Sequence, residues 1–222
     1  MNILFIGNSY TYYNDMPLLF ENLCVENGRD VKVNAVTCGG HKLYEYLDNE
    51  DQYVEELNAL AKNQKYDICF LQEHSTFSTL KTDIFVDAVY RLTEKLKNCA
   101  KQFILYETWG RKAGSDVLEM NQWTNESMTF KVAEAYKKAS EKVSVPISHV
   151  GRYFYDITNN HKEINLYHED LSHPSYEGSC LAALTHYVTV FKTFPKNTDS
   201  LGLNQSVLDV YKDVIMREAA EE

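Results

Sequence analysis

Two short motifs near opposite ends of the chain carry residue types that can catalyse acyl transfer. Ser9 follows the apolar run ILFI and a Gly-Asn pair, whereas Asp170 and His173 lie three residues apart near the other end. An apolar run this short, stopped by glycine, predicts a strand buried on both faces, with Ser9 at the sheet edge where open α/β sheets bind ligands. A serine there can act as a nucleophile if a histidine reaches its hydroxyl. Without such a histidine, the same serine would be interpreted as the cap of the next helix.

The residues around His173 suit the remaining roles in that chemistry. His173 would accept the Ser9 proton through one ring nitrogen, and Asp170 could reach the other nitrogen, fixing the tautomer and stabilising the imidazolium. Pro174 disfavours helical angles at His173, and Ser175 is expected to cap the helix that follows. Because a DxxH spacing also occurs in solvated loops, the prediction depends on the combination of the two motifs.

That combination resembles the SGNH, or GDSL, hydrolase family. The resemblance is carried by GNSYT after the first predicted strand, Gly-Gly after the second, and DLSHPSYEGSCLAA before the last core helix. It implies that Ser9 is the nucleophile and that Asp170 and His173 complete a catalytic triad. It also implies an oxyanion hole made by the backbone N–H of Ser9, the backbone N–H of Gly40 and a side-chain amide from a third motif, with Gly39 as the alternative register for the glycine.

The third motif departs from the family pattern. The usual G-x-N-D is replaced by LQEHS, in which Gln72 carries the same primary amide as asparagine on one more methylene. We therefore expect Gln72 to be the third oxyanion donor, the alternative being that it only bonds a loop backbone. The first motif also differs, with Gly-Asn-Ser in place of Gly-Asp-Ser, but asparagine can hold a turn by similar side-chain bonds.

Other polar and aromatic residues at the predicted strand ends are candidates for substrate binding. Glu73 and Glu107 could orient loops or bind substrate hydroxyls, and as a pair they could also serve glycoside cleavage. Trp109 and Trp123 lie in the excursion at residues 107–124, which we expect to form a wall or lid over Ser9.

Metal binding is not predicted from the histidines. His74 and His168 could join His173 as metal ligands, but no pair has the helical spacing of a metal motif, so polar or surface roles are favoured. The prediction is that the protein uses no metal and no cofactor.

Strand and helix patterns alternate along the chain and predict a three-layer α/β/α sandwich. We expect a flavodoxin-like parallel sheet of about five strands in one domain spanning residues 1–222, without repeats or linkers. The predicted strands are residues 3–6, 31–35, 67–71, 103–106 and 145–150. The main predicted helices are residues 16–27, 43–63, 84–96, about 125–143, one that follows residue 175, and an acidic helix at the end.

Composition limits the partners and the compartment. The 222 residues are 44% hydrophobic and 24% charged, with a formal net charge of -10, which disfavours binding to nucleic acid or to anionic lipid. No apolar run is long enough to cross a membrane, and no export signal is recognised. The five cysteines are scattered without CxxC spacing, which indicates reduced thiols and a cytoplasmic location.

The sequence therefore predicts a serine esterase acting on a small-molecule ester through an acyl-enzyme, with an O-acetyl group on a carbohydrate as one candidate substrate. Two alternatives stay open: a non-catalytic ligand-binding module on a flavodoxin-like sheet, and a degenerate SGNH protein that binds acylated ligands. The absence of GxGxxG and GxxxxGK[ST] in the first turn argues against a phosphate-binding module. The sequence does not indicate an oligomeric state.

Overall fold

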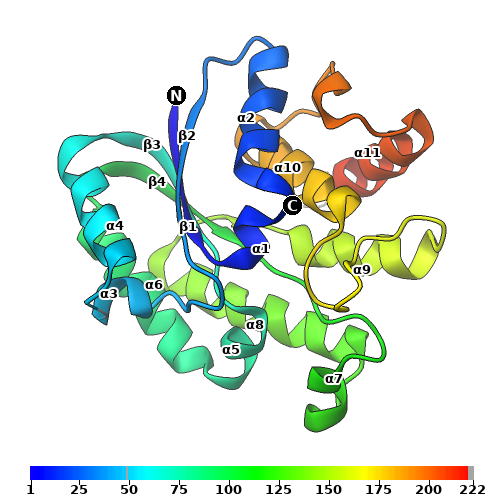
Figure 1. Cartoon of the computed structure of the whole chain (residues 1–222), viewed down its shortest axis with the longest axis horizontal. Coiled ribbons are helices and arrows are strands. Elements are labelled where there is room, and N and C mark those ends of the chain that lie inside the picture. The colour runs from blue at the N-terminus through cyan, green and yellow to red at the C-terminus, as the bar shows by residue number, and fades with distance from the viewer. Residues whose placement is uncertain (49, 220–222) are drawn as a thin grey trace.

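The protein is built on a parallel sheet of five strands in the order β2-β1-β3-β4-β5 (Figure 1). The computed structural model describes residues 1–48 and 50–219. The strands are β1 (Asn2–Gly7), β2 (Lys32–Thr37), β3 (Tyr66–Leu71), β4 (Ala100–Tyr106) and β5 (Ile147–Ser148). All four pairings are parallel, which confirms the predicted sheet and makes β2 an edge strand.

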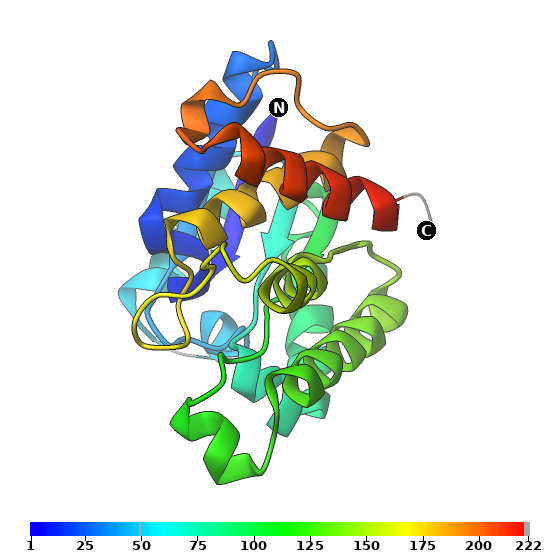
Figure 2. The same ribbon diagram turned by 90° about the vertical axis from the view of Figure 1, so that its right-hand side faces the viewer.

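Helices cover both faces of this sheet, as the two ribbon views show (Figures 1 and 2). On one side lie α2 (Met16–Glu26), α9 (Val150–Asn160), α10 (Tyr176–Phe191) and α11 (Gln205–Ala219). On the other lie α3 (Glu45–Asp48), α4 (Gln52–Asn63), α6 (Thr82–Leu96) and α8 (Asn125–Val143). Shorter elements connect these layers: α1 (Ser9–Tyr12), α5 (Ser75–Leu80), α7 (Asp116–Asn121), and the 3-10 turns η1 (Tyr13–Asp15) and η2 (Asp199–Leu201). The predicted three-layer α/β/α sandwich is confirmed.

The alternation of side chains along β1 divides the interior into two cores. Ile3 and Phe5 pack into the core beneath α2 and α10, whereas Leu4 and Ile6 pack into the core beneath α6 and α8. Each of these four side chains is at most 1% exposed. Because successive side chains of a strand point to opposite faces, an unbroken apolar run is what a central strand requires.

The fifth strand is shorter than predicted, and a helix follows it where no clear element was expected. β5 has only two residues instead of 145–150, because the chain enters α9 directly after His149. Glu107, at the end of β4, holds this turn by accepting hydrogen bonds from His149 Nδ1 (3.0 Å) and the backbone N–H of Arg152 (3.2 Å). Gly151 is required there, because a Cβ would lie 2.0 Å from the carbonyl oxygen of Thr108.

The strand order places the switch point of the sheet between β1 and β3. From β1 the chain first moves outward to β2 and then returns past β1 to β3, so the carboxyl ends of β1 and β3 flank the crevice where ligands bind in such sheets. Ser9 follows β1 and the Gln72-Glu73-His74 segment follows β3, so both motifs lie at this crevice.

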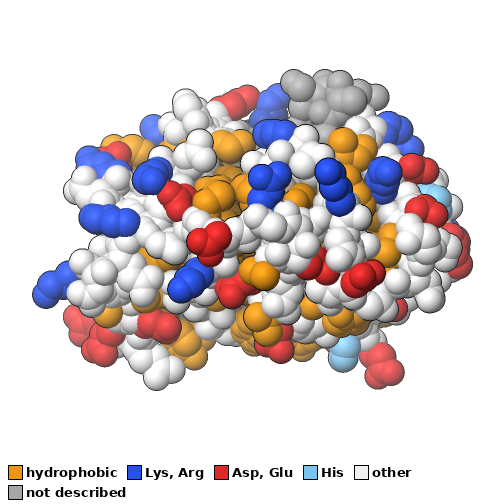
Figure 3. Space-filling view, turned by 90° about the horizontal axis from the view of Figure 1, so that it is seen from above, with side chains coloured by type: hydrophobic (Ala, Val, Ile, Leu, Met, Phe, Trp, Pro, Cys, Tyr) orange, Lys and Arg blue, Asp and Glu red, His pale blue; other side chains and the backbone are white. Residues whose placement is uncertain are grey.

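Charge is mixed on the face of the molecule seen from above in Figure 3. Lys and Arg side chains alternate there with Asp and Glu side chains, so the negative net charge does not form a single-sign field on that face. Within the described residues, no helix is both long and apolar enough to span a membrane.

Candidate active site

Ser9 stands at the first position of α1, and Asn8 caps that helix. The Asn8 side-chain oxygen accepts a hydrogen bond from the Tyr10 backbone N–H (3.1 Å), so Ser9 is not needed as the cap. Ser9 is partly exposed while Asn8 and Tyr10 are buried. In the part of the chain that the structure describes, the Ser9 backbone N–H makes no hydrogen bond. It is therefore free to donate to a substrate oxygen.

Gln72 does not offer an amide N–H to a substrate, so the prediction that it is an oxyanion donor is corrected. Its side-chain oxygen accepts from the Asn8 backbone N–H and from the Thr11 hydroxyl, each at 2.8 Å, which fixes the orientation of the amide. Its nitrogen then donates to Asn8 Oδ1 (3.0 Å) and to the carbonyl of Glu73 (2.7 Å). Both amide hydrogens are used within the protein, so Gln72 braces the turn that presents Ser9.

The turn after β2 that contains Gly39 and Gly40 is held by a hydrogen bond from the Asn8 side chain. Asn8 Nδ2 donates to the carbonyl oxygen of His41 (2.9 Å), and the His41 N–H closes the turn on the Cys38 carbonyl (3.2 Å). Gly40 has φ +75°, a backbone conformation that glycine adopts without strain. Gly39 and Gly40 are both exposed, and neither backbone N–H has a partner among the described residues. In either register, the turn that is bonded to Asn8 therefore offers a backbone N–H without a partner among the described residues.

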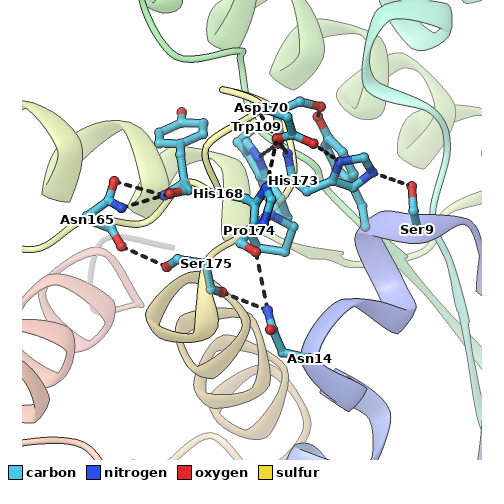
Figure 4. Close-up of polar contacts among 12 residues, drawn as sticks. Ser9, Asn14, Trp109, Asn165, His168, Asp170, His173, Pro174 and Ser175 are labelled. Atoms are coloured by element: carbon cyan, nitrogen blue, oxygen red, sulfur yellow. Dashed lines mark hydrogen bonds and ion pairs between the residues drawn. The ribbon is translucent and has the colours of Figure 1, made fainter.

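The histidine of the DxxH motif reaches across to the serine of the first motif (Figure 4). His173 Nε2 lies 2.8 Å from Ser9 Oγ, and His173 Nδ1 is hydrogen-bonded to Asp170 Oδ2. The other carboxylate oxygen of Asp170 accepts the backbone N–H groups of Ser172 (3.0 Å) and His173 (2.9 Å). Although burial acts in the opposite direction, these hydrogen bonds from His173 and Ser172 lower the pKa of the Asp170 carboxyl, which keeps it ionised.

Residues just after Ser9 hold the histidine loop in place. Asn14 donates through its amide to the carbonyls of Pro174 (3.2 Å) and Ser175 (3.0 Å), as Figure 4 shows, and to the Ser179 hydroxyl (2.9 Å). The Tyr13 ring stacks on the imidazole of His173, with centroids 4.1 Å apart. Asn14 has a left-handed φ of 53°, which is uncommon outside glycine and marks a residue with a special structural role.

A buried aromatic stack supports the loop from below. Trp109 lies between Tyr10 (centroids 4.6 Å apart) and Phe154 (3.9 Å), and its indole N–H donates to the Ser172 carbonyl (3.0 Å). The Tyr10 hydroxyl is 2.9 Å from Ser172 Oγ. These bonds fix the backbone immediately before His173.

Three residues predicted to bind substrate have no surface with which to do so. Trp109 and Glu73 are 0% exposed and Glu107 is 1% exposed. Glu73 instead accepts the backbone N–H groups of Leu43 (3.0 Å) and His74 (2.6 Å), and burial raises its pKa to about 8. Glu107 holds the start of α9, as described above. These predictions are corrected: the three side chains are buried, and each forms hydrogen bonds with the backbone of a neighbouring loop or turn.

The other predicted residues have different surroundings. Trp123 packs against the core of the opposite face, with Lys131 Nζ 5.9 Å from its ring, so the two tryptophans do not form one wall. His168 contributes its backbone N–H to the His173 carbonyl (2.8 Å). Among the described residues, no group of three or more His, Cys, Asp or Glu side chains is arranged to hold a metal ion.

A second serine–histidine pair lies inside the protein. Ser148 Oγ is 2.7 Å from His186 Nδ1, but both side chains are 0% exposed. Burial lowers the pKa of His186 to about 3, so its imidazole is neutral at physiological pH. No carboxylate contacts this pair among the described residues, and a substrate could not reach it without opening the core.

Comparisons with known proteins agree with this geometry. No family model and no curated protein matches the sequence. The fold matches a candidate SGNH hydrolase from Slackia heliotrinireducens with 29% sequence identity and a TM-score of 0.75, over 86% of this chain and 98% of that one. The chain is therefore similar to SGNH/GDSL-type hydrolases in fold.

More distant structures share the fold of this chain. A DUF4886 family protein from Bacteroides uniformis matches over 99% of this chain and 95% of its own, with a TM-score of 0.81 and 14% identity. The acetyl xylan esterase AlAXEase matches over 86% of this chain and all of its own, with a TM-score of 0.63 and 17% identity.

The Gly-Asp-Ser motif of SGNH/GDSL-type hydrolases would not suit this chain, because Asn8 donates where aspartate can only accept. We expect Asn8→Asp to keep the helix cap and the bond from Gln72 but to place a carboxylate oxygen against the His41 carbonyl. The Gly39-Gly40 turn should then move away from Ser9, and kcat for an aryl acetate should fall by about ten- to a hundredfold.

The thermal midpoint of Asn8→Asp, measured beside kcat, separates this effect from unfolding. Asn8→Ala is the matched comparison, because it loses the cap as well and should be the less stable variant. Wild-type kcat in Asn8→Asp would mean that the bond from Cys38 N–H to the Gly7 carbonyl is enough to hold the turn.

Proposed function

We propose that the protein is a serine esterase that hydrolyses a small acyl ester through a Ser9–His173–Asp170 triad. The observation that carries the proposal is the continuous hydrogen-bonded chain from Ser9 Oγ through His173 to Asp170, at the sheet's switch point. Ser9 and His173 are both partly exposed, as a nucleophile and its base must be. Similarity to esterases of known structure supports the same reaction class.

In the first half of the reaction, Ser9 Oγ attacks the ester carbonyl while His173 Nε2 takes its proton. The Asp170 carboxylate holds His173 in the tautomer whose Nε2 is unprotonated, and it stabilises the imidazolium once the proton has moved. The backbone N–H groups of Ser9 and of Gly40, or of Gly39 in the alternative register, donate to the oxyanion. His173 then protonates the leaving alcohol, which leaves an acyl group on Ser9.

In the second half, water replaces the alcohol. His173 removes a proton from the water as it attacks the acyl carbonyl, the same donors hold the oxyanion, and His173 returns the proton to Ser9 as the acid leaves. Every proton transfer uses His173 Nε2, so this mechanism needs no metal or cofactor.

An O-acetyl group on a carbohydrate is the substrate that we put forward first. The acetyl xylan esterase AlAXEase shares the fold of this chain at 17% sequence identity, and this similarity in fold supports the choice. The exposed position of the Gly39-Gly40 turn is compatible with an ester carried by a large alcohol.

The proposal is tested with a panel of p-nitrophenyl esters from acetate to decanoate, together with acetylated xylo-oligosaccharides. We expect turnover to be highest for acetate and to fall with chain length, and we expect a fluorophosphonate probe to label Ser9. Probe labelling without turnover of any ester would favour a degenerate protein that binds acylated ligands. A purified protein that carries a chromophore or nucleotide and ignores the probe would favour a binding module.

A further inference from the structure

A buried arginine lies close to the proposed nucleophile without an acidic partner. Arg111 follows the Glu107-Thr108-Trp109 segment at the end of β4 and is 9% exposed. Its guanidinium carbon lies 5.4 Å from the centre of the Tyr10 ring, and Tyr10 is the residue next to Ser9. The same ring meets the His173 imidazole edge-on, with centroids 5.5 Å apart. Tyr10 therefore links Arg111 to the reacting groups.

No group in the described part of the chain neutralises this guanidinium. Arg111 forms no ion pair there, and its buried Nε has no hydrogen-bond partner. Glu73 lies next to His74 in the sequence, but its carboxyl serves two backbone N–H groups, and with a pKa of about 8 it is largely neutral at pH 7. The Asp170 carboxylate is hydrogen-bonded to His173 instead. A buried cation without a partner is costly, which points to a ligand as the missing partner.

His74 is near enough to Arg111 and His173 for both to influence its pKa, and one of its ring nitrogens has no hydrogen-bond partner among the described residues. Burial, followed by the positive charges of Arg111 and Lys42, lowers the pKa of His74 to about 4, so its ring is neutral at physiological pH. Its Nδ1 is buried and has no hydrogen-bond partner. A neutral imidazole can donate one hydrogen bond beside the guanidinium without adding charge.

We propose that Arg111, with His74 beside it, binds a carboxylate on the substrate, so that the enzyme prefers esters that carry an acidic group. This inference rests on the proposed esterase function and names the substrate class of the same site. A single guanidinium matches a singly charged carboxylate, whose two oxygens fit its planar fork, better than it matches a doubly charged phosphate.

The proposal is tested by comparing matched pairs of acetyl esters. The 2-, 3- and 4-acetoxybenzoates each carry a carboxylate, and their methyl esters are neutral analogues of nearly the same shape. The aryl butyrate and aryl hemisuccinate pair tests a carboxylate on the acyl side. We expect kcat/KM to be higher for the acid than for its neutral partner in at least one pair, through a lower KM.

Substitutions at Arg111 should remove this preference. In Arg111→Gln the acid-to-neutral ratio of kcat/KM should fall by about ten- to a hundredfold, and Arg111→Lys should retain part of it. Lys112→Gln is the matched control, because it removes a neighbouring cation whose side chain is bonded to Asn165 (3.0 Å), and it should leave the ratio unchanged. An equal loss for both members of a pair in Arg111→Gln would indicate a structural role and overturn the proposal, as would a wild-type enzyme without any preference for the acid.

A binding measurement separates this proposal from the proposed function. Ser9→Ala should bind 4-acetoxybenzoate more tightly than its methyl ester in calorimetry, and the double variant with Arg111→Gln should lose that difference. If Ser9→Ala binds the acid selectively but the wild-type protein hydrolyses no ester, the anion site is supported and the esterase function is rejected. Turnover of neutral esters without selective binding would keep the esterase and reject the anion site.

Discussion

Ser9→Ala should lower kcat for p-nitrophenyl acetate by about six orders of magnitude, the scale of loss when a serine nucleophile is removed. The substitution removes only the hydroxyl group, and among the described residues that group bonds only to His173. Asn8 still caps α1, and Gln72 still braces the turn, so the thermal midpoint should change little. Steady-state kinetics and a thermal melt on the same preparation check both expectations.

The buried pair of Ser148 and His186 provides the control for the Ser9→Ala experiment. Ser148→Ala removes a hydroxyl that bonds His186 (2.7 Å) and Thr189 (3.1 Å), so it should cost about 1–3 kcal/mol of stability while catalysis continues in the folded fraction. The assignment of Ser9 would be refuted by the reverse pattern, in which Ser9→Ala still turns over ester and Ser148→Ala, well folded, does not.

Asp170→Asn should lower kcat by about a thousand- to ten-thousandfold while leaving the fold intact. The asparagine oxygen can still accept the backbone N–H groups of Ser172 and His173, so its NH₂ group must face His173 Nδ1. His173 then accepts at Nδ1 and carries its hydrogen on Nε2, where it can no longer take the Ser9 proton. The measurement is kcat as a function of pH.

Glu169→Gln is the matched control for Asp170→Asn. It removes the same charge from the adjacent position, where an exposed side chain makes no hydrogen bond among the described residues, so its rate should be close to wild type. A rate in Asp170→Asn equal to that of Glu169→Gln would show that the carboxylate does not orient His173. A backbone carbonyl would then have to do so.

The central part of the fold could be predicted because its signals are local. The run ILFI specifies a strand buried on both faces, and alternation of Ile3 and Phe5 with Leu4 and Ile6 serves both cores. The proximity of Ser9 and His173 could also be anticipated, because carboxyl-edge loops of a parallel sheet meet at one end. The helix at 150–160 carried a usable signal, since Val150, Phe154 and Ile157 are buried at helical spacing.

The roles of side chains at strand ends could not be predicted in the same way. An amide such as Gln72 can face a substrate or a neighbouring turn, and only the three-dimensional partners of its oxygen and nitrogen decide between them. Trp109 and Glu107 likewise follow β4 into the interior, although their place after a strand suggested a surface role. No buried position or binding role could be predicted for Arg111, because an arginine in a polar loop is usually exposed to solvent.

The hydrogen bond between Ser9 and His173 also has a consequence for the protein during its synthesis on the ribosome. The two residues are separated by 164 positions, and the loop carrying His173 is held by Asn14 and by α10, which packs against α2. A nascent chain therefore exposes Ser9 early but has no base to activate it until His173 and the helix α10 that follows it have emerged. Contacts of such long sequence separation form late in folding, so truncated or misfolded chains should be unable to hydrolyse cellular esters.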